Sequence, residues 1–218
     1  DVPPGLKDVP QFFGPARDGV VRGAGLARDW AAQPPRQLWR QPIGAGWSSF
    51  SVAQGKAYTQ EQRGEEEWVS CYDPLTGSPI WSHRRSTRFF QWQAGEGPHA
   101  TPTIDRGRVF AYGGTGILDC IDAESGARVW SRPVLEENGL GNLTWGVSAS
   151  PLVVDDLVIV TGGDPLGLPA RRIEALIIAY SDDDFDRPVD LAPLEAIPGV
   201  RLLAFDACQK GHGTTYTD

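Results

Sequence analysis

Cys208 and His212 are the two residues of this 218-residue chain whose types and spacing could form a catalytic pair. A thiol nucleophile would need a histidine from a separate upstream strand to raise its thiolate fraction. The upstream histidines, His83 and His99, lie inside repeated β units instead. His99 is a single histidine near the start of a predicted strand, and one histidine without partners is not a metal site. We therefore predict no catalytic, cofactor-binding or metal-binding residues.

Residues 182–186 form an acidic run whose carboxylates could supply oxygen ligands to a hard cation. The run lacks the loop glycine and the distal glutamate of an EF-hand, so we interpret it as a solvated acidic loop. The three cysteines, Cys71, Cys120 and Cys208, are an odd number, and the first two occupy equivalent positions of a repeat. We interpret them as small buried apolar residues.

An eleven-residue motif, Cys-x-Asp-x-x-(Thr/Ser)-Gly-x-x-x-Trp, begins at Cys71 and again at Cys120. Its Asp can accept hydrogen bonds from backbone N–H groups two or three residues on, the hydroxyl supports the same turn, and the Gly supplies a positive φ. Apolar residues flank each copy, which predicts strand, tight turn, strand. The residues that we predict to be structural are Asp73, Thr76, Gly77, Trp81, Asp122, Ser125, Gly126 and Trp130.

A second repeated block precedes each motif and begins at Ser49, Thr101 and Ser150. In each copy a Gly or Asp separates two apolar segments, which predicts a hairpin. Each unit therefore contains two hairpins, or four strands. Four-stranded units at a spacing of roughly 45 residues are typical of propeller blades. An earlier segment, Leu38-Trp39-Arg40, resembles the strand that ends the motif without its turn.

The composition agrees with a β-rich chain. It contains 26 Gly, 18 Pro and eight Trp, which favour many turns and large packed aromatic side chains. No apolar run is long enough to span a bilayer. The net charge of −8, without a basic stripe, argues against nucleic acid as a partner. Because the chain contains no Met, Asp1 is not a translation start, and the absence of an export signal says nothing about compartment.

The eleven-residue motif resembles the tryptophan-docking motif of the bacterial pyrroloquinoline quinone-like, or quinoprotein-type, β-propeller repeat family. The resemblance implies that the Trp of one blade packs against the turn of the next and locks the ring. Trp81 and Trp130 would then be the docking residues, and Gly77 and Gly126 the flat surfaces that they need. Family members usually have Ala first and Lys after the Gly, whereas this chain has Cys and a small residue.

The resemblance covers roughly residues 9–165, because residues 9–20 are also similar to the lead-in of many export-associated bacterial members. The third unit lacks a matching motif where one is expected, although Ala204-Phe205-Asp206 restores its start. We therefore predict four regions. They are a lead-in at 1–36, blades at 37–165 (two units and the first hairpin of a third), an insertion or divergent segment at 166–203, and a possible resumption of the third blade, truncated, at 204–218.

The predicted fold is all-β: an incomplete β-propeller of about two to three four-stranded antiparallel blades, with an irregular insertion. Closed propellers use about four to eight blades, so we expect a fragment of a longer protein, or a ring that another chain completes. A natural C-terminus with a well-packed, closed domain would contradict this expectation.

The resemblance implies two classes of function. We favour a non-catalytic module that acts as a binding or assembly scaffold in the periplasm or otherwise outside the cytoplasm, and that binds a protein or small-molecule ligand on a propeller face. The alternative is a fragment of a pyrroloquinoline quinone-dependent alcohol or sugar dehydrogenase, which would bind the quinone and Ca²⁺. That enzyme class typically has adjacent cysteines and Glu, Asn and Asp ligands to Ca²⁺, none of which can be matched here. No cofactor is therefore predicted, and we lean against enzymatic activity.

Trp47, Trp92 and Trp145 precede the first hairpin of successive units. They could form an aromatic surface for a ligand or a peptide. Packing between blades is the commoner role of such residues and is the one we expect.

Overall fold

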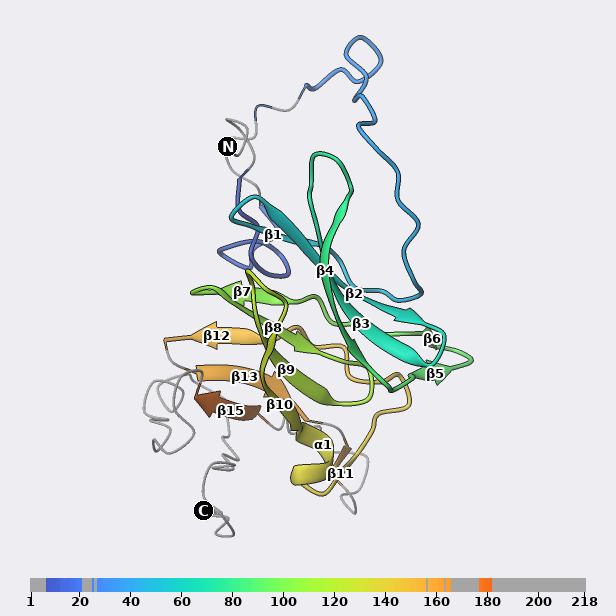
Figure 1. The fold of residues 1–218 in the computed structure, drawn as a ribbon, viewed down its shortest axis with the longest axis vertical. Helices are drawn as coiled ribbons and strands as arrows, with labels where there is room; N and C mark the ends of the chain where they lie inside the picture. Colours follow the sequence, from blue (N-terminus) through green and yellow to red (C-terminus); the bar gives the residue numbers. More distant parts are fainter. Residues whose placement is uncertain are drawn as a thin grey trace.

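The computed structural model describes residues 7–20, 25, 27–155, 157–162, 164–165 and 177–181. Within these residues almost all regular structure is antiparallel β-strand, and three sheets follow one another in chain order, stacked face against face (Figure 1). No helix in the described part of the chain is long and apolar enough to cross a membrane.

The first two sheets are four-stranded meanders with the same strand order. The first contains β1 (Ser51–Ala53), β2 (Lys56–Arg63), β3 (Glu66–Tyr72) and β4 (Pro79–Arg85). The second contains β7 (Thr103–Asp105), β8 (Arg108–Tyr112), β9 (Ile117–Asp122) and β10 (Arg128–Pro133). Each strand pairs with its sequence neighbour, so the predicted four-stranded antiparallel blades are confirmed.

The third sheet contains β12 (Leu152–Val154), β13 (Leu157–Thr161) and β15 (Ile177–Ser181). Smaller elements lie in the connections between sheets. They are the hairpin of β5 (Phe90–Gln91) and β6 (Gly95–Glu96), the short helix α1 (Val134–Glu137), and the pair of β11 (Leu140–Gly141) and β14 (Asp164–Pro165).

The register of the third sheet shows which residues replace the missing motif. In the second sheet Cys120 pairs with Phe110, three residues after the hairpin turn, and in the third sheet Ala179 pairs with Ile159 at the same position. Ala179 therefore takes the place that cysteines hold in the first two sheets. This third strand lies within the predicted segment 166–203, whereas residues 182–218 lie outside the described part. The predicted region boundaries therefore stay predictions.

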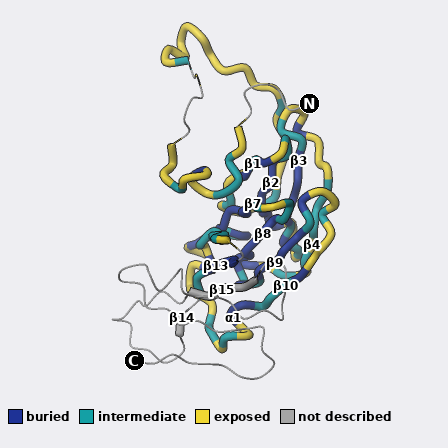
Figure 2. Tube along the Cα trace, turned by 90° about the vertical axis from the view of Figure 1, so that its left-hand side faces the viewer, coloured by how far each residue is buried: buried dark blue, intermediate teal, exposed yellow. Residues whose placement is uncertain are grey.

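Two hydrophobic cores lie between the sheets, and Figure 2 shows the buried residues concentrated on the strands. The core between the first and second sheets contains Ala53, Tyr58, Val69, Cys71, Ile104, Val109, Ala111, Ile121 and Ala123. The core between the second and third sheets contains Ala100, Phe110, Tyr112, Leu118, Cys120, Trp130, Val134, Leu135, Val147, Val158 and Val160. Burial of each large apolar side chain contributes about 1.5–3 kcal/mol, so these inter-sheet cores are the main source of stability.

Cys71 and Cys120 lie in successive cores and are fully buried. Their interpretation as small buried apolar residues is therefore confirmed, while Cys208 falls outside the described residues. The innermost strands also meet, since β1 lies against β7 and β7 against β12. The three sheets are therefore arranged as consecutive blades around one side of an axis, with their first strands nearest to it.

Candidate functional site

The loops of the blades form two faces, because an antiparallel meander places alternate turns at opposite ends. One end, which we call the motif face, carries the turns within residues 54–55, 73–78, 106–107 and 122–127. The other end, the connection face, carries the turns at 64–65 and 113–116 and the longer connections 86–102 and 134–151. These two faces and the contacts between blades are the places to look for function.

On the motif face, both aspartates of the repeated motif close a tight turn. Asp73 Oδ1 accepts hydrogen bonds from the backbone N–H groups of residues 75 and 76, at 2.7 and 3.0 Å. Asp122 Oδ1 accepts from Ser125 N at 2.9 Å and from Ser125 Oγ at 2.7 Å. These hydrogen bonds from Ser125 hold the pKa of Asp122 below its ordinary value. Both carboxylates are therefore engaged in shaping the turn.

The glycine of each motif receives an indole from the preceding part of the chain. Gly126 has φ +74°, and a Cβ there would lie 2.7 Å from the ring of Trp81. The Trp81 indole donates to the carbonyl of Ala123 at 3.1 Å. Trp39 stacks on Gly77 in the same way and donates to the carbonyl of Pro74 at 2.9 Å. Each indole thus covers the turn of the following sheet.

Trp130 lies in the core between the second and third sheets and is 7% exposed. The turn that would follow β15, where an equivalent glycine is expected, lies outside the described residues. Thr76 and Ser125 each accept a hydrogen bond from the backbone N–H two residues later, at 3.2 and 3.3 Å. The predicted repeat residues in the described part therefore make turn and packing contacts.

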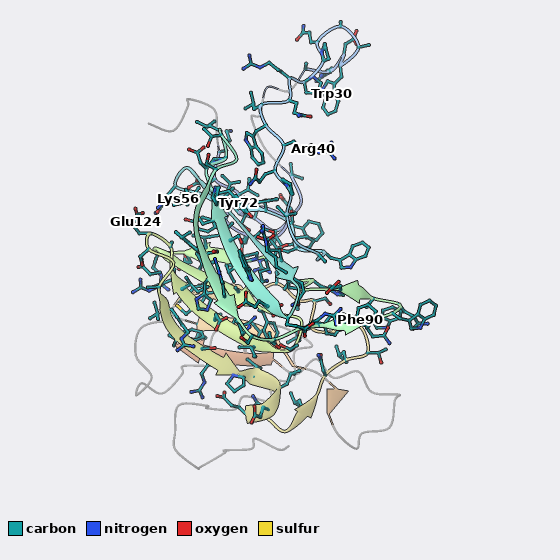
Figure 3. All side chains as sticks on the ribbon, turned by 45° about the vertical axis from the view of Figure 1, so that its right-hand side comes forward. Trp30, Arg40, Lys56, Tyr72, Phe90 and Glu124 are labelled. Atoms are coloured by element: carbon teal, nitrogen blue, oxygen red, sulfur yellow. The ribbon has the colours of Figure 1, made fainter. Side chains whose placement is uncertain are left out.

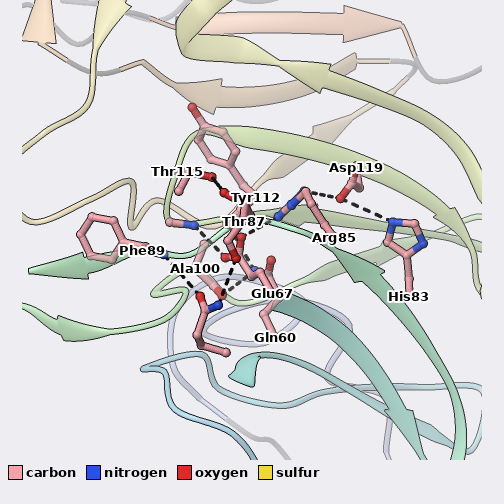
Figure 4. A network of polar contacts seen from close by, with 12 residues as sticks. Gln60, Glu67, His83, Arg85, Thr87, Phe89, Ala100, Tyr112, Thr115 and Asp119 are labelled. Carbon is pink, nitrogen blue, oxygen red and sulfur yellow. Dashed lines mark hydrogen bonds and ion pairs between the residues drawn. The ribbon is translucent and has the colours of Figure 1, made fainter. Parts of the chain in front are cut away.

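A buried ion-pair network joins the first two blades near the connection face (Figure 4). Arg85, at the end of β4, binds Glu67 of its own blade at 2.8 Å and also Asp119 of the next blade. The second oxygen of Glu67 accepts a hydrogen bond from Gly114 N of the next blade, at 2.9 Å. Both carboxylate side chains are almost fully buried, and each has a cationic partner. The network therefore holds one blade to the next.

His83 lies at the edge of this network, with Nε2 3.8 Å from Oδ2 of Asp119. Burial is the largest influence on this histidine and lowers its pKa; Asp119 acts in the opposite direction, and Arg85 and Arg128 lower it further. The net effect is a pKa below the ordinary value of 6.5. His83 is therefore neutral at pH 7.

Two glutamine amides fasten the long connection 86–102 to the first blade (Figure 4). Gln60 Nε2 donates to the carbonyls of Ala100 and Tyr112, at 2.8 and 3.3 Å. Gln62 Nε2 donates to the carbonyl of Thr87 at 3.0 Å, and its Oε1 accepts from Phe89 N at 3.3 Å. These side chains fix where the connection leaves the sheet and where it returns.

Glu61 is a fully buried carboxylate that ties the approach to β1 to the end of β2. It accepts hydrogen bonds from Gly44 N, Ser70 Oγ and Tyr72 OH, and it pairs with Arg63 at 3.0 Å. Burial acts to raise its pKa, but these hydrogen bonds outweigh burial and hold the pKa below the ordinary value of 4.5. Glu61 is therefore a structural anion.

A chain of hydroxyl contacts links the innermost strands, and the sequence analysis did not predict it. Ser49 N donates to Thr101 Oγ1 at 3.0 Å, and Thr101 N donates to Ser150 Oγ at 2.9 Å. Two residues further on, the hydroxyls of Ser51 and Thr103 each donate at 2.6 Å to the carbonyl of the proline before the next inner strand. The sequence did contain a signal for these contacts, because each copy of the second repeated block begins with a hydroxyl residue, at Ser49, Thr101 and Ser150.

The connection face exposes four large aromatic side chains. Trp47, Trp92 and Trp145 are 70%, 80% and 53% exposed, and Phe90 on the β5–β6 hairpin is 58% exposed. Figure 3 shows Phe90 on this hairpin, which projects from the sheets. Trp92 and Trp145 are more than half exposed and do not have the expected role of packing between blades, whereas Trp47 also contacts the connection between the first two blades. Their large exposed area is available to a partner.

Trp47 is held in place by residues of the connection 86–102. The Trp47 indole donates to the carbonyl of Ala94 at 2.9 Å, and its ring meets the edge of His99. His99 also meets the ring of Phe89 edge-on. Burial lowers the pKa of His99. These contacts hold the indole of Trp47 against the connection 86–102.

The two cysteines of the described residues are not the adjacent pair that the dehydrogenase alternative would have. Cys71 and Cys120 belong to separate cores, and burial raises the pKa of Cys71 to about 12, so its thiol stays protonated. Within the described ranges no three His, Cys, Asp or Glu side chains are grouped to hold a metal ion. Cys208, His212 and the acidic run 182–186 lie outside those ranges.

A family model matches residues 65–176, more than half of the chain, and its description is outer membrane protein assembly factor BamB. Comparison with curated proteins gives no match.

Several solved structures are similar to parts of the chain. One is a quinohemoprotein alcohol dehydrogenase from Pseudomonas putida HK5, with 22% identity over 65% of this chain and 20% of that chain and a TM-score of 0.47. Another is the corresponding enzyme from Comamonas testosteroni, with 21% identity over 65% and 20% and a TM-score of 0.45. BamB from Moraxella catarrhalis has 18% identity over 56% and 33%, with a TM-score of 0.41. The chain spans only 20% to 33% of the length of these proteins.

Proposed function

Because the chain belongs to the pyrroloquinoline quinone-like β-propeller repeat family, we propose that it is a non-catalytic scaffold that binds a protein partner outside the cytoplasm. The family description names an outer membrane protein assembly factor, and this supports both an assembly role and a location in the cell envelope. The proposed partner is an envelope protein.

The observation that carries the proposal is the aromatic group on the connection face. Phe90 and Trp92 project on a two-stranded hairpin, and Trp92 is 80% exposed. Trp is enriched among the few central residues of protein interfaces that contribute most of the binding free energy, and other aromatic side chains are also enriched in interfaces. Large exposed apolar areas on a protein surface commonly mark sites of interaction with a partner.

The titratable residues of the described blades support the same proposal. Glu67 and Asp119 are paired with Arg85, Glu61 accepts four hydrogen bonds, and the thiol of Cys71 is held protonated by burial. These groups stabilise contacts within and between blades, which is the chemistry of a scaffold.

Site-specific photo-cross-linking tests the proposal. A photoreactive amino acid at position 92, in protein produced in the cell envelope of a bacterial host, should cross-link to a discrete envelope protein. The matched control is position 30, because Trp30 is 59% exposed but lies on the lead-in, far from the sheets (Figure 3). Equal cross-linking at positions 92 and 30, or none at either, would contradict the proposal.

Titration with pyrroloquinoline quinone and Ca²⁺ separates this proposal from the dehydrogenase alternative. A scaffold should leave the absorbance of the quinone unchanged and should reduce no dye when an alcohol is added. A red-shifted quinone spectrum with alcohol-dependent dye reduction would overturn the scaffold proposal in favour of a quinone-dependent dehydrogenase.

A further inference from the structure

The lead-in residues 8–19 lie against the inner strands of the blades. Val9 forms a β-bridge with Val52 of β1, with N–H···O distances of 2.7 and 2.9 Å in the two directions. The next residue, Pro10, accepts a hydrogen bond from Ile104 N of β7 at 2.7 Å. Figure 1 shows this segment as a dark blue loop beside β1 and β7. Consecutive residues of the lead-in thus bind consecutive blades.

The two N–H donors occupy equivalent positions. Val52 pairs with Ala57 across the first hairpin, and Ile104 pairs with Val109 across the second, each one residue before the strand ends. An inner strand has a sheet partner on one side only, so its other edge presents backbone groups that need hydrogen-bond partners. The lead-in carbonyls supply these partners at the free inner edge of both blades.

Arg17 extends the contact to the third blade. Its guanidinium donates to the carbonyl of Pro151, immediately before β12, at 2.5 Å. The same guanidinium donates to Gln11 Oε1 at 2.9 Å, and Gln11 donates to the carbonyl of Pro15 at 3.0 Å, which closes the loop on itself. Burial lowers the pKa of Arg17. One short loop therefore binds the inner edges of three consecutive blades.

Phe12 and Phe13 lie on the part of this loop that the three blades do not cover. Their ring centroids are 4.1 Å apart, and the side chains are 40% and 58% exposed. Phe13 also has a φ of +65°, which is costly for a bulky aromatic residue and persists only where surrounding contacts enforce it. The lead-in contacts hold an exposed apolar pair in a strained conformation beside the axis.

We propose that residues 8–19 are an axial plug for the whole propeller, and that Phe12 and Phe13 pack against the inner strand of a further blade of the same polypeptide. The surface is continuous with the contacts already made to three inner strands. A closed propeller has at least about four blades, so a further inner strand must approach the same axis. The inner strands β1 and β7 carry small or β-branched residues such as Val52 and Ile104, and β-branched side chains pack favourably against aromatic rings.

Thermal unfolding of the polypeptide that carries the remaining blades tests this proposal. The double variant F12S/F13S should lower its Tm by about 5 °C, because two buried rings would be lost. The control variant W30S removes an aromatic residue that is similarly exposed but lies far from the sheets, and should leave the Tm unchanged. In the 218-residue chain by itself, F12S/F13S should also leave the Tm unchanged.

Three outcomes would overturn the plug. The first is an unchanged Tm for F12S/F13S in the longer polypeptide, and the second is an equal decrease in Tm in both polypeptides. The third is a decrease in Tm that appears only where light scattering shows that two copies associate. If F12S/F13S fails to fold, F12L/F13L, which keeps apolar side chains, should fold with an intermediate Tm. A disulfide should form in the variant V9C/V52C, because the backbones of these two residues are directly paired. In this disulfide-linked variant, F12S/F13S should still lower the Tm of the longer polypeptide.

Discussion

Trp39 and Trp81 make the same contact with successive turns, although only Trp81 belongs to a complete motif. Each indole covers a glycine, at Gly77 and Gly126, and each donates to the carbonyl of the residue after the motif aspartate. A glycine at this position gives a positive φ without strain and leaves room for the ring. The contact therefore depends on the absence of one Cβ.

Gly126→Ala should destabilise the protein more than Gly107→Ala does. Both glycines have nearly the same φ, +74° and +75°, so both substitutions cost about 1–2 kcal/mol of left-handed strain. At Gly107 the new Cβ meets nothing within 4 Å, whereas at Gly126 it would lie 2.7 Å from Trp81. We expect a further loss of about 1–3 kcal/mol at Gly126, measured by urea unfolding. Equal losses would show that the indole contact is not a constraint.

The protein should lose stability as the pH falls below 6.5, partly because of His83. Burial keeps the pKa of His83 in the folded protein below 6.5, whereas the unfolded chain has the ordinary value. Between these two values the unfolded state binds more protons, so the free energy of unfolding decreases as the pH falls. His83→Gln should make this decrease shallower in urea unfolding between pH 7 and pH 5. An identical pH dependence in the variant would show that His83 does not contribute.

At the scale of elements, the first two blades are held together by three kinds of contact. An apolar core fills the space between the sheets, hydroxyls link the inner strands, and Arg85 joins the ends of β3, β4 and β9 through Glu67 and Asp119. The apolar core is non-directional, whereas the polar contacts require one relative position of the two sheets. Together they fix the angle between neighbouring blades.

Arg85→Ala should cost about 3–5 kcal/mol of stability, because it leaves the buried carboxylates of Glu67 and Asp119 without their cation. The matched control is Arg88→Ala. Arg88 pairs with Glu96 at 2.9 Å in an exposed position, so its loss should lower the stability much less. Urea unfolding of both variants measures the difference, and similar losses would mean that the buried network adds nothing to the contact between blades.

At the scale of the whole molecule, the lead-in crosses from the first blade to the third. This path satisfies backbone groups at the inner edges of blades that would otherwise face the axis unpaired. The described sheets lie around one side of that axis, with their first strands nearest to it. The contact between lead-in and blades is therefore a feature of the assembly and not of any single blade.

Removal of residues 1–19 should increase hydrogen exchange at two specific amides. Val52 N and Ile104 N donate to carbonyls of the lead-in and would lose these partners. Gly126 N donates to Asp122 O in the local motif turn, so its exchange should change little and serves as the control. Hydrogen exchange followed by NMR measures all three amides. Unchanged exchange at both Val52 and Ile104 would contradict the observed pairing.

The amino-acid sequence alone determined the turns, the four-stranded units and the family. These features depend on hydrogen bonds between residues two or three positions apart and on local apolar patterns, both of which can be read along the chain. The sequence also singled out Trp39 as an incomplete copy of the strand that ends the motif.

Only the tertiary structure decided which residues of neighbouring units contact one another. It placed Trp39 on Gly77, joined Arg85 to Asp119, made β15 the third strand of the third blade, and left Trp92 exposed instead of packed. Each of these outcomes depends on which residues meet across a sheet or between sheets. Partners far apart in the sequence are selected by packing and burial over the whole fold, and no local pattern encodes that selection.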